Sequence, residues 1–183
     1  HPDYDPIWAT AQDFNVSVCI HQVVNPYYVG NQWYADRDPG FMWVTINHIQ
    51  DQRIALASMV YDGVFDRFPK LRVGTVEATM QWAAEWLERF EFRYTYMGHT
   101  TQMKRSPKEY FAENIWIQGD PEEKMFAFVA EFCGVDRFFI GSDYPHAEGF
   151  VNPVQTAREQ LSELPGESVE KILCDNARKF YGL

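Results

Sequence analysis

The sequence predicts an α/β protein built on a parallel β-sheet. Short apolar segments alternate with amphipathic segments along the 183 residues, which is the pattern of successive βαβ units. Four of the apolar segments are expected to be strands. No Gly-rich phosphate-binding motif follows any of them, so a nucleotide-binding fold is not supported. An open doubly wound sheet and a closed (β/α)₈ barrel both fit this order of elements.

The four strands are identified by runs of β-branched and aromatic residues. They are expected at residues 16–21, 71–77, 114–118 and 137–141. A polar or ionisable residue ends or closely follows each of them: His21, Glu77, Gln118 and Asp143. In a (β/α)₈ barrel the carboxyl ends of the strands carry the chemistry. The strand ends therefore indicate where a functional site would lie.

Helices are predicted between and after these strands. The most regular begins near Trp82, where Trp86 and Phe90 continue an apolar face at helical spacing. Ser106-Pro107-Lys108-Glu109 is typical of a capping box that opens a short helix, and Asp120-Pro121-Glu122-Glu123 predicts another helix start. Further helices are expected at about 46–61, 153–164 and 168–181. The aromatic-rich loop 22–40 is interpreted as a lid or a dimer contact.

Composition limits the possible partners. The chain carries 16 basic and 26 acidic residues, for a net charge of −10, which argues against nucleic acid and against an anionic membrane surface. No apolar run approaches the ~20 residues of a spanning helix. The three cysteines are widely spaced and predict a reducing compartment, the cytoplasm. A small molecule is the expected partner.

Three ionisable residues at strand ends are candidates for a metal or proton-transfer site. His21 could be a metal ligand, or it could simply bond a neighbouring carbonyl. Asp143 could bind a metal and accept a proton, or it could only form a turn before Pro145. Glu77 could be a proton donor, a metal ligand or the partner of an arginine such as Arg72 or Arg137.

Two more histidines are candidates for contact with a substrate. His48 lies near the start of the first predicted helix that follows the loop 22–40, and His146 follows Pro145 on a loop. Each, taken alone, is more often a solvated surface histidine. We predict that both bind substrate.

Several motifs, taken in this order and spacing, resemble the amidohydrolase-related family of aminocarboxymuconate-semialdehyde and γ-resorcylate decarboxylases. The matching segments, spread along almost the whole chain, are 5–9, 18–21, 63–71, Glu77 with Trp82, 106–107 with 110–111, 134–137, 141–146, 171–173 and 175–178.

The resemblance implies the C-terminal half of a metal-dependent (β/α)₈ TIM barrel, with about four βα units that supply strands five to eight. In that family the fifth-strand histidine and the eighth-strand aspartate are metal ligands, and these positions fall on His21 and Asp143. The aspartate also handles a proton. A divalent ion is implied, zinc first and manganese as an alternative.

Two features depart from the family pattern. The first-strand His-x-His or Glu-x-His, which supplies two further ligands, is not in the sequence. Glu77 stands where characterised decarboxylases end their sixth strand in a catalytic histidine. Glu77 is therefore expected to replace that histidine as acid/base or to bind a cation.

The resemblance implies a metal-dependent hydrolase or non-oxidative decarboxylase that acts on a small organic substrate, carboxylated or aromatic. We expect residues 1–183 to be one amidohydrolase-related domain that lacks its N-terminal part, since the chain begins at His1 rather than at methionine. The full-length protein is expected to be a homo-oligomer. The alternative is a catalytically silent half-barrel, either a truncated product or an interaction subunit, because two protein ligands are too few for a catalytic zinc site.

Overall fold

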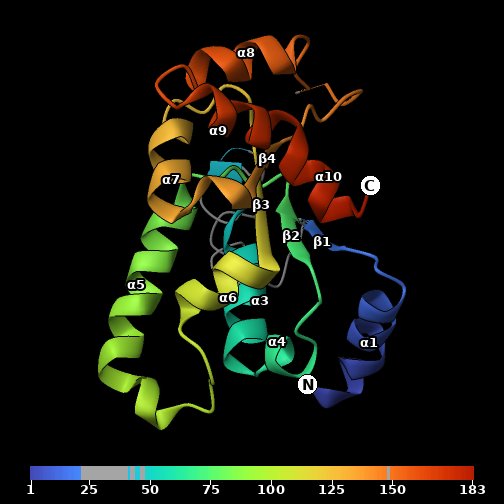
Figure 1. Cartoon of the computed structure of the whole chain (residues 1–183), viewed down its shortest axis with the longest axis vertical. Helices are drawn as coiled ribbons and strands as arrows, with labels where there is room; N and C mark the ends of the chain where they lie inside the picture. Colours follow the sequence, from blue (N-terminus) through green and yellow to red (C-terminus); the bar gives the residue numbers. More distant parts are fainter. Residues whose placement is uncertain (22–40, 42–43, 46–47, 148) are drawn as a thin grey trace.

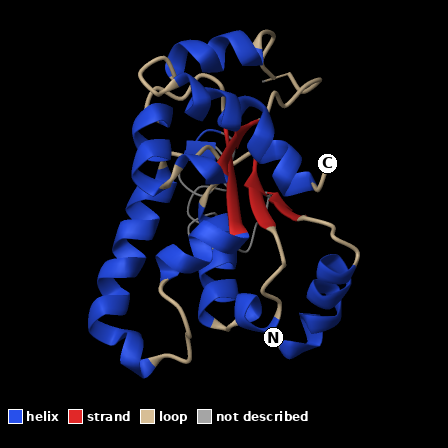
Figure 2. Ribbon diagram, viewed as in Figure 1, coloured by secondary structure: helices blue, strands red, loops and turns tan. Residues whose placement is uncertain are grey.

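The computed structural model describes residues 1–21, 41, 44–45, 48–147 and 149–183. Its centre is a sheet of four parallel strands in the order β1-β2-β3-β4. Figure 2 shows these strands side by side in the middle of the molecule, with helices around them. The strands are β1 (Val18–His21), β2 (Val73–Val76), β3 (Ile115–Gly119) and β4 (Phe138–Ile140). All four predicted strands are confirmed, with ends that differ by at most two residues.

Each strand pairs with the next one along the chain. Val18 lies opposite Val73, and Val73 lies opposite Ile115. Ile117 lies opposite Phe138. Sequential parallel pairing with helical crossovers is the arrangement of a barrel wall, so the structure matches part of a (β/α)₈ barrel.

The helices alternate with the strands and pack around them (Figure 1). Their bounds, in chain order, are α1 (Asp5–Asp13), α3 (Gln50–Tyr61), α4 (Val64–Arg67), α5 (Trp82–Met97), α6 (Pro107–Asn114), α7 (Phe126–Cys133), α8 (Pro153–Gln160), α9 (Gly166–Glu170) and α10 (Asn176–Tyr181). Short 3₁₀ segments are η1 (Pro2–Tyr4), η3 (Gly98–Thr100) and η4 (Val135–Arg137), and the π-helical turn η5 (Lys171–Asp175) joins α9 to α10. No described helix combines the length and the apolar character that crossing a bilayer requires. The loop 22–40 lies outside the described residues.

Two helix predictions are corrected. The helix expected from Asp120 begins only at Phe126, because residues 121–125 form turns. The carboxylate of Glu123 accepts the N–H groups of Asp120 and of Met80, and the bond from Met80 ties this segment to the distant loop after β2. The helix expected at 168–181 begins at Gly166 and is interrupted by the π-helical turn η5.

The two faces of the sheet contact different partners. Val73, Ile117 and Phe138 belong to the main hydrophobic core, to which α3, α5, α6 and α7 contribute their apolar faces. On the other face, Trp116 and Phe139 pack with Phe180 of α10. The C-terminal helix therefore covers the face opposite to the main core.

The helix α10 is held at the amino end of β2. Arg72, which directly precedes β2, donates from Nε to the carbonyl oxygen of Phe180 at 2.7 Å. A Cβ atom added to Gly74 would lie 2.7 Å from the Phe180 ring. Val76, the last residue of β2, also packs against the cluster that contains Phe180.

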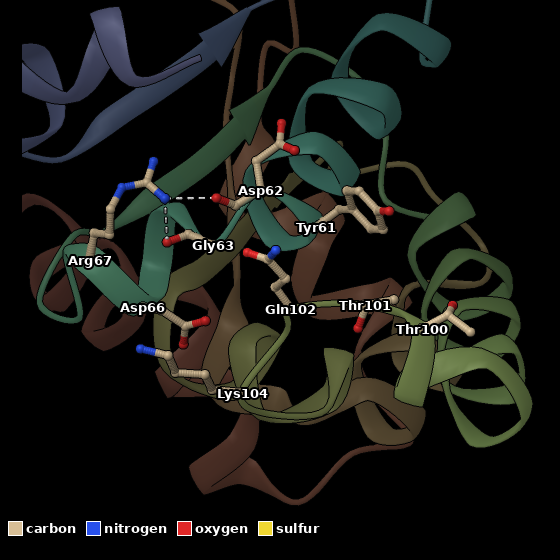
Figure 3. Close-up of a pocket in the computed structure, with 9 residues that line it drawn as sticks. All are labelled: Tyr61, Asp62, Gly63, Asp66, Arg67, Thr100, Thr101, Gln102 and Lys104. Atoms are coloured by element: carbon tan, nitrogen blue, oxygen red, sulfur yellow. Dashed lines mark hydrogen bonds between the residues drawn. The ribbon is translucent and has the colours of Figure 1, made fainter.

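A hollow of about 500 Å³ lies between the α3–α4 turn and the segment that follows η3 (Figure 3). It is lined by Tyr61, Asp62, Gly63, Asp66, Arg67, Thr100, Thr101, Gln102 and Lys104. None of the residues predicted to form the functional site lines it.

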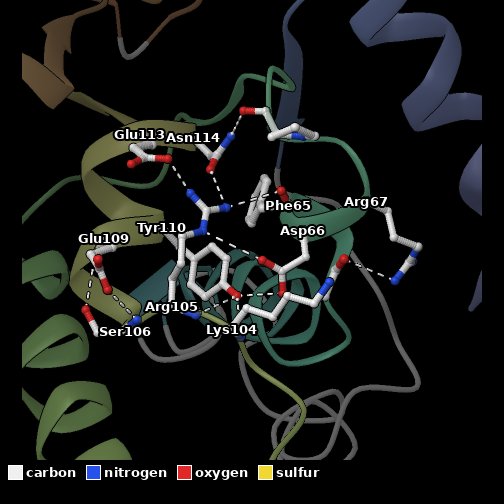
Figure 4. A network of polar contacts seen from close by, with 12 residues as sticks. Phe65, Asp66, Arg67, Lys104, Arg105, Ser106, Glu109, Tyr110, Glu113 and Asn114 are labelled. Atoms are coloured by element: carbon white, nitrogen blue, oxygen red, sulfur yellow. Dashed lines mark hydrogen bonds and ion pairs between the residues drawn. The ribbon is translucent and has the colours of Figure 1, made fainter.

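A polar network beside this hollow fixes the chain before β2 and β3 (Figure 4). The Tyr110 hydroxyl donates to Asp66 at 2.7 Å, and Arg105 forms ion pairs with Asp66 and Glu113. Buried Asn114 donates to the carbonyl oxygens of Pro69 and Leu71 at 2.9 and 3.0 Å. These bonds satisfy backbone groups at the strand starts, so this end of the sheet serves stability.

The predicted capping box at the start of α6 is confirmed. Ser106 Oγ accepts the N–H of Glu109, and the Glu109 carboxylate accepts the N–H of Ser106 at 2.8 Å. These bonds lower the pKa of Glu109.

Candidate active site

The side chains of His21 and Glu77 are in contact at the carboxyl ends of β1 and β2. His21 is the last residue of β1 and lies opposite Val76, the residue before Glu77. The pair joins His21 Nε2 to Glu77 Oε2, with side chains 53% and 27% exposed. Glu77 has a φ of 53°, a left-handed conformation that is uncommon for residues other than glycine. Such backbone strain is concentrated at functional sites.

The arginines that were alternative partners of Glu77 are engaged elsewhere. Arg72 bonds Asn15 and the carbonyl oxygen of Phe180. The guanidinium of Arg137 lies 4.3 Å from the centre of the Trp116 ring. Among the contacts that the structure describes, Glu77 pairs with the strand-end histidine His21.

Asp143 and His146 form a second pair, on the loop that follows β4. Asp143 Oδ2 lies 3.1 Å from His146 Nδ1, and the N–H of His146 donates to the Asp143 carbonyl oxygen at 2.8 Å. Asp143 has a φ of 50°, and the Tyr144–Pro145 peptide bond is cis. Asp143 thus forms a turn, as its alternative interpretation predicted, and its carboxylate also has a histidine partner.

Gln118 lies between these two pairs, on β3. A Cβ atom added to Gly141 would lie 2.3 Å from the side-chain amide of Gln118. Residue 141 must therefore be glycine for Gln118 to lie against the backbone that leads to Asp143.

Asp120 is a site residue that the sequence reasoning missed. It follows β3 directly, and its pKa is raised by burial and further by the negative charges of Asp143 and Glu77. The negative charges of Asp143 and Glu77 therefore act on Asp120 at the carboxyl ends of the strands. The signal was present, because Asp120 follows a strand just as Glu77 does, but the interpretation as a helix cap hid it.

The start of α3 also contacts the carboxyl end of β2. Gln52 is buried, and its Nε2 donates to the carbonyl oxygen of Val76 at 2.9 Å. His48 lies in the turn two residues before α3. A role of His48 or His146 in substrate binding stays a prediction.

The side chains at the strand ends carry the kinds of atom that bind divalent metal ions. An imidazole nitrogen and carboxylate oxygens are ligands that Zn²⁺ and Mn²⁺ both accept. The contact between Nε2 of His21 and the Glu77 carboxylate brings two such donors to one point. Within the described residues, no group of three His, Cys, Asp or Glu side chains is placed to hold a metal ion. These residues therefore offer part of a ligand set, and the remaining ligands would have to come from elsewhere.

Comparison with known proteins gives a family match over the whole chain. The model of the amidohydrolase family matches residues 1–183. A curated relative, 2-amino-3-carboxymuconate-6-semialdehyde decarboxylase from Dictyostelium discoideum, is 25% identical over all of this chain and 49% of its own length. The chain thus spans about half the length of this relative.

Two solved structures illustrate the similarity of fold. A crystal structure of an amidohydrolase from Mycobacterium avium subsp. paratuberculosis K-10 is 28% identical, with a TM-score of 0.82, over 98% of this chain and 45% of that one. A dihydroxybenzoic acid decarboxylase from Polaromonas sp. JS666, solved with bound manganese and an inhibitor, is 20% identical, with a TM-score of 0.78, over 98% of this chain and 54% of that one.

Proposed function

The chain belongs to the amidohydrolase family, and on that premise we propose that it forms the C-terminal half of a metal-dependent non-oxidative decarboxylase. In this proposal β1 to β4 are strands five to eight of the (β/α)₈ barrel, and residues 1–183 are part of one domain. The substrate is a small carboxylated molecule, aromatic or unsaturated. One observation carries the proposal: His21, Glu77, Asp120 and Asp143 all end or follow parallel strands at the same edge of the sheet.

His21 and Asp143 would hold the divalent ion, zinc or manganese, together with ligands from outside the described residues. A bound divalent ion supplies positive charge that stabilises negative charge developing on the substrate. Manganese in the Polaromonas decarboxylase and the decarboxylase name of the curated relative support this choice.

Decarboxylation requires one proton transfer by the protein. The C–C bond to the carboxylate breaks, CO₂ leaves, and the carbon that keeps the electron pair must receive a proton. We assign that transfer to Asp143, whose carboxylate is oriented by His146 at 3.1 Å. Glu77 assists by holding His21 in place and by supplying a second carboxylate. Asp143 could equally take a proton from water, and hydrolysis of a C–N, C–O or C–C bond is the alternative reaction.

The test uses the natural full-length protein, stripped of metal with a chelator and reloaded with Mn²⁺ or Zn²⁺. Hydroxybenzoates and an aminocarboxymuconate semialdehyde are assayed for CO₂ release, and amides and lactones for hydrolysis. We expect CO₂ release that depends on metal and falls at least 100-fold in Asp143→Asn. Hydrolysis alone would favour the alternative reaction, and activity independent of metal would overturn the proposal.

A silent interaction subunit is the second candidate. It is favoured by the absence, within the described residues, of any three-residue group placed to hold a metal ion. Failure of the reloaded full-length protein to bind any divalent ion would support this candidate.

A further inference from the structure

We propose that Glu123 is a positioning residue that fixes two loops of the candidate site, the one that carries Glu77 and the one that carries Asp120. The expected effect on kcat rests on the proposed function, whereas the expected effect on the two loops does not. Glu123 itself lies outside the residues assigned to metal binding and proton transfer.

The carboxylate of Glu123 joins the loops after β2 and β3. It is 6% exposed. The N–H of Met80, three residues after Glu77, donates to both of its oxygens at 3.0 Å. The N–H of Asp120 donates to Oε1 at 2.8 Å. One buried side chain therefore satisfies backbone donors from both loops.

The loop after β2 depends on an outside partner of this kind. Glu77 and Thr79 both have positive φ values, 53° and 52°. Gln81, which precedes α5, makes no side-chain capping bond. Met80 lies two residues before α5, and its N–H donates to the Glu123 carboxylate, so Glu123 supplies an acceptor to the turn that leads into α5.

Close packing connects the same two loops. A Cβ atom added to Gly119 would lie 2.8 Å from the Phe126 ring and 2.9 Å from the Met80 side chain. Met80 is fully buried. This contact therefore helps to keep the loop that carries Glu77 and the loop that carries Asp120 in a fixed relative position.

Burial raises the pKa of Glu123 to about 7, although the N–H groups of Met80 and Asp120 act in the opposite direction. Burying a carboxylate costs free energy unless it is hydrogen-bonded. The geometry above supplies those bonds.

The test compares Glu123→Gln with Glu109→Gln in the natural full-length protein. Both glutamates accept backbone N–H groups near the start of a helix, but Glu109 lies at α6, among residues that fix the strand starts. Glutamine keeps the size of the side chain and replaces one acceptor oxygen with a donor. Hydrogen exchange is measured at Met80 and Asp120, and decarboxylation kinetics on the substrates named above.

We expect Glu123→Gln to speed exchange at residues 77–81 and 119–121 about 10-fold or more, and Glu109→Gln to leave these segments unchanged. The kcat of Glu123→Gln should fall about 10-fold to 100-fold with little change in KM, because misplacement of a catalytic group by ~1 Å costs this much. Unchanged exchange, or kcat within twofold of the natural protein, would overturn the proposal.

A double-mutant cycle separates positioning from general destabilisation. If Glu123 acts through Glu77, adding Glu123→Gln to Glu77→Gln should cost little further activity, and a fully additive loss would contradict the inference. If the natural protein itself decarboxylates nothing, the proposed function fails, while the exchange measurements still decide whether Glu123 fixes the two loops.

Discussion

At the scale of single residues, the carboxylates at the strand ends differ by environment. Glu77 and Asp143 each have a histidine partner, whereas Asp120 is buried near both and feels their charges. Glu123 is also buried, and its carboxylate accepts the backbone N–H groups of Met80 and Asp120. The carboxylates thus differ in their surroundings. Those of Glu77 and Asp143 contact a histidine, that of Asp120 is affected by nearby negative charges, and that of Glu123 bonds the backbone of two loops.

Glu123 should make the stability of the protein depend on pH. Its folded pKa of about 7 lies above the ordinary value of 4.5, so between these pH values the folded state holds a proton that the unfolded state releases. Stability is therefore greatest below pH ~4.5 for this group and falls as the pH rises through 7, by roughly 3 kcal/mol at most. Urea unfolding of the full-length protein at pH 5 to 8 measures the effect.

The variants Glu123→Gln and Glu109→Gln separate the contribution of Glu123 to this pH dependence from that of other groups. Glu123→Gln should lose the decline with pH, because the amide does not titrate. Glu109→Gln should keep it, since the pKa of Glu109 is lowered and its contribution disappears only in acid. Parallel curves for the natural protein and Glu123→Gln would refute the prediction.

At the scale of elements, two similar sequences adopt different structures. Ser106-Pro107-Lys108-Glu109 opens α6, while Asp120-Pro121-Glu122-Glu123 forms turns and the next helix begins at Phe126. In both segments the glutamate accepts the N–H of the residue three positions earlier. Only Glu123 is also bonded to Met80 from a distant loop. Tertiary bonding therefore overrides the local helix signal.

The contact between β2 and α10 predicts a specific packing defect. Gly74→Ala would place a methyl group 2.7 Å from the Phe180 ring. Overpacking of this kind costs about 1–3 kcal/mol. The urea midpoint of the full-length protein should fall accordingly, and Phe180→Leu combined with Gly74→Ala should recover part of the loss.

Gly166→Ala is the matched control for this prediction. A Cβ atom at Gly166, the first residue of α9, meets nothing within 4 Å. Its effect should stay within about 0.5 kcal/mol. Equal effects of the two substitutions would show that Phe180 does not pack on β2 as described.

At the scale of the whole molecule, the sheet matches part of a barrel wall. The chain spans 49%, 45% and 54% of the three similar proteins described above. In the described sheet β1 pairs with β2 and β4 pairs with β3, so each terminal strand has one edge without a described partner. Unpaired edges favour association with another chain.

We expect residues 1–183, expressed alone, to aggregate, to pair with a second chain or to remain loosely packed. Size-exclusion chromatography with light scattering gives the mass, and a thermal melt followed by near-ultraviolet circular dichroism gives the cooperativity. A monomer that melts sharply in two states and retains stoichiometric zinc would contradict this expectation.

The sequence by itself determined the α/β class, the four strands and the residues that end them. These features depend on periodicity and on short apolar runs, which are local. His21, Glu77 and Asp143 could be named because each ends or follows a strand. Only the tertiary structure placed His21 beside Glu77, since neighbours in a sheet are set by strand order and register.

The tertiary structure also decided the roles of Asp120 and Glu123. Locally, their segment has the signature of a helix start. In the folded chain the carboxylate of the buried residue Glu123 accepts the N–H of Asp120, three residues away, and the N–H of Met80, 43 residues away in the sequence. A bond between residues so far apart leaves no periodic pattern in the sequence. The position of Glu123 is therefore decided by how the loops pack at the carboxyl ends of the strands.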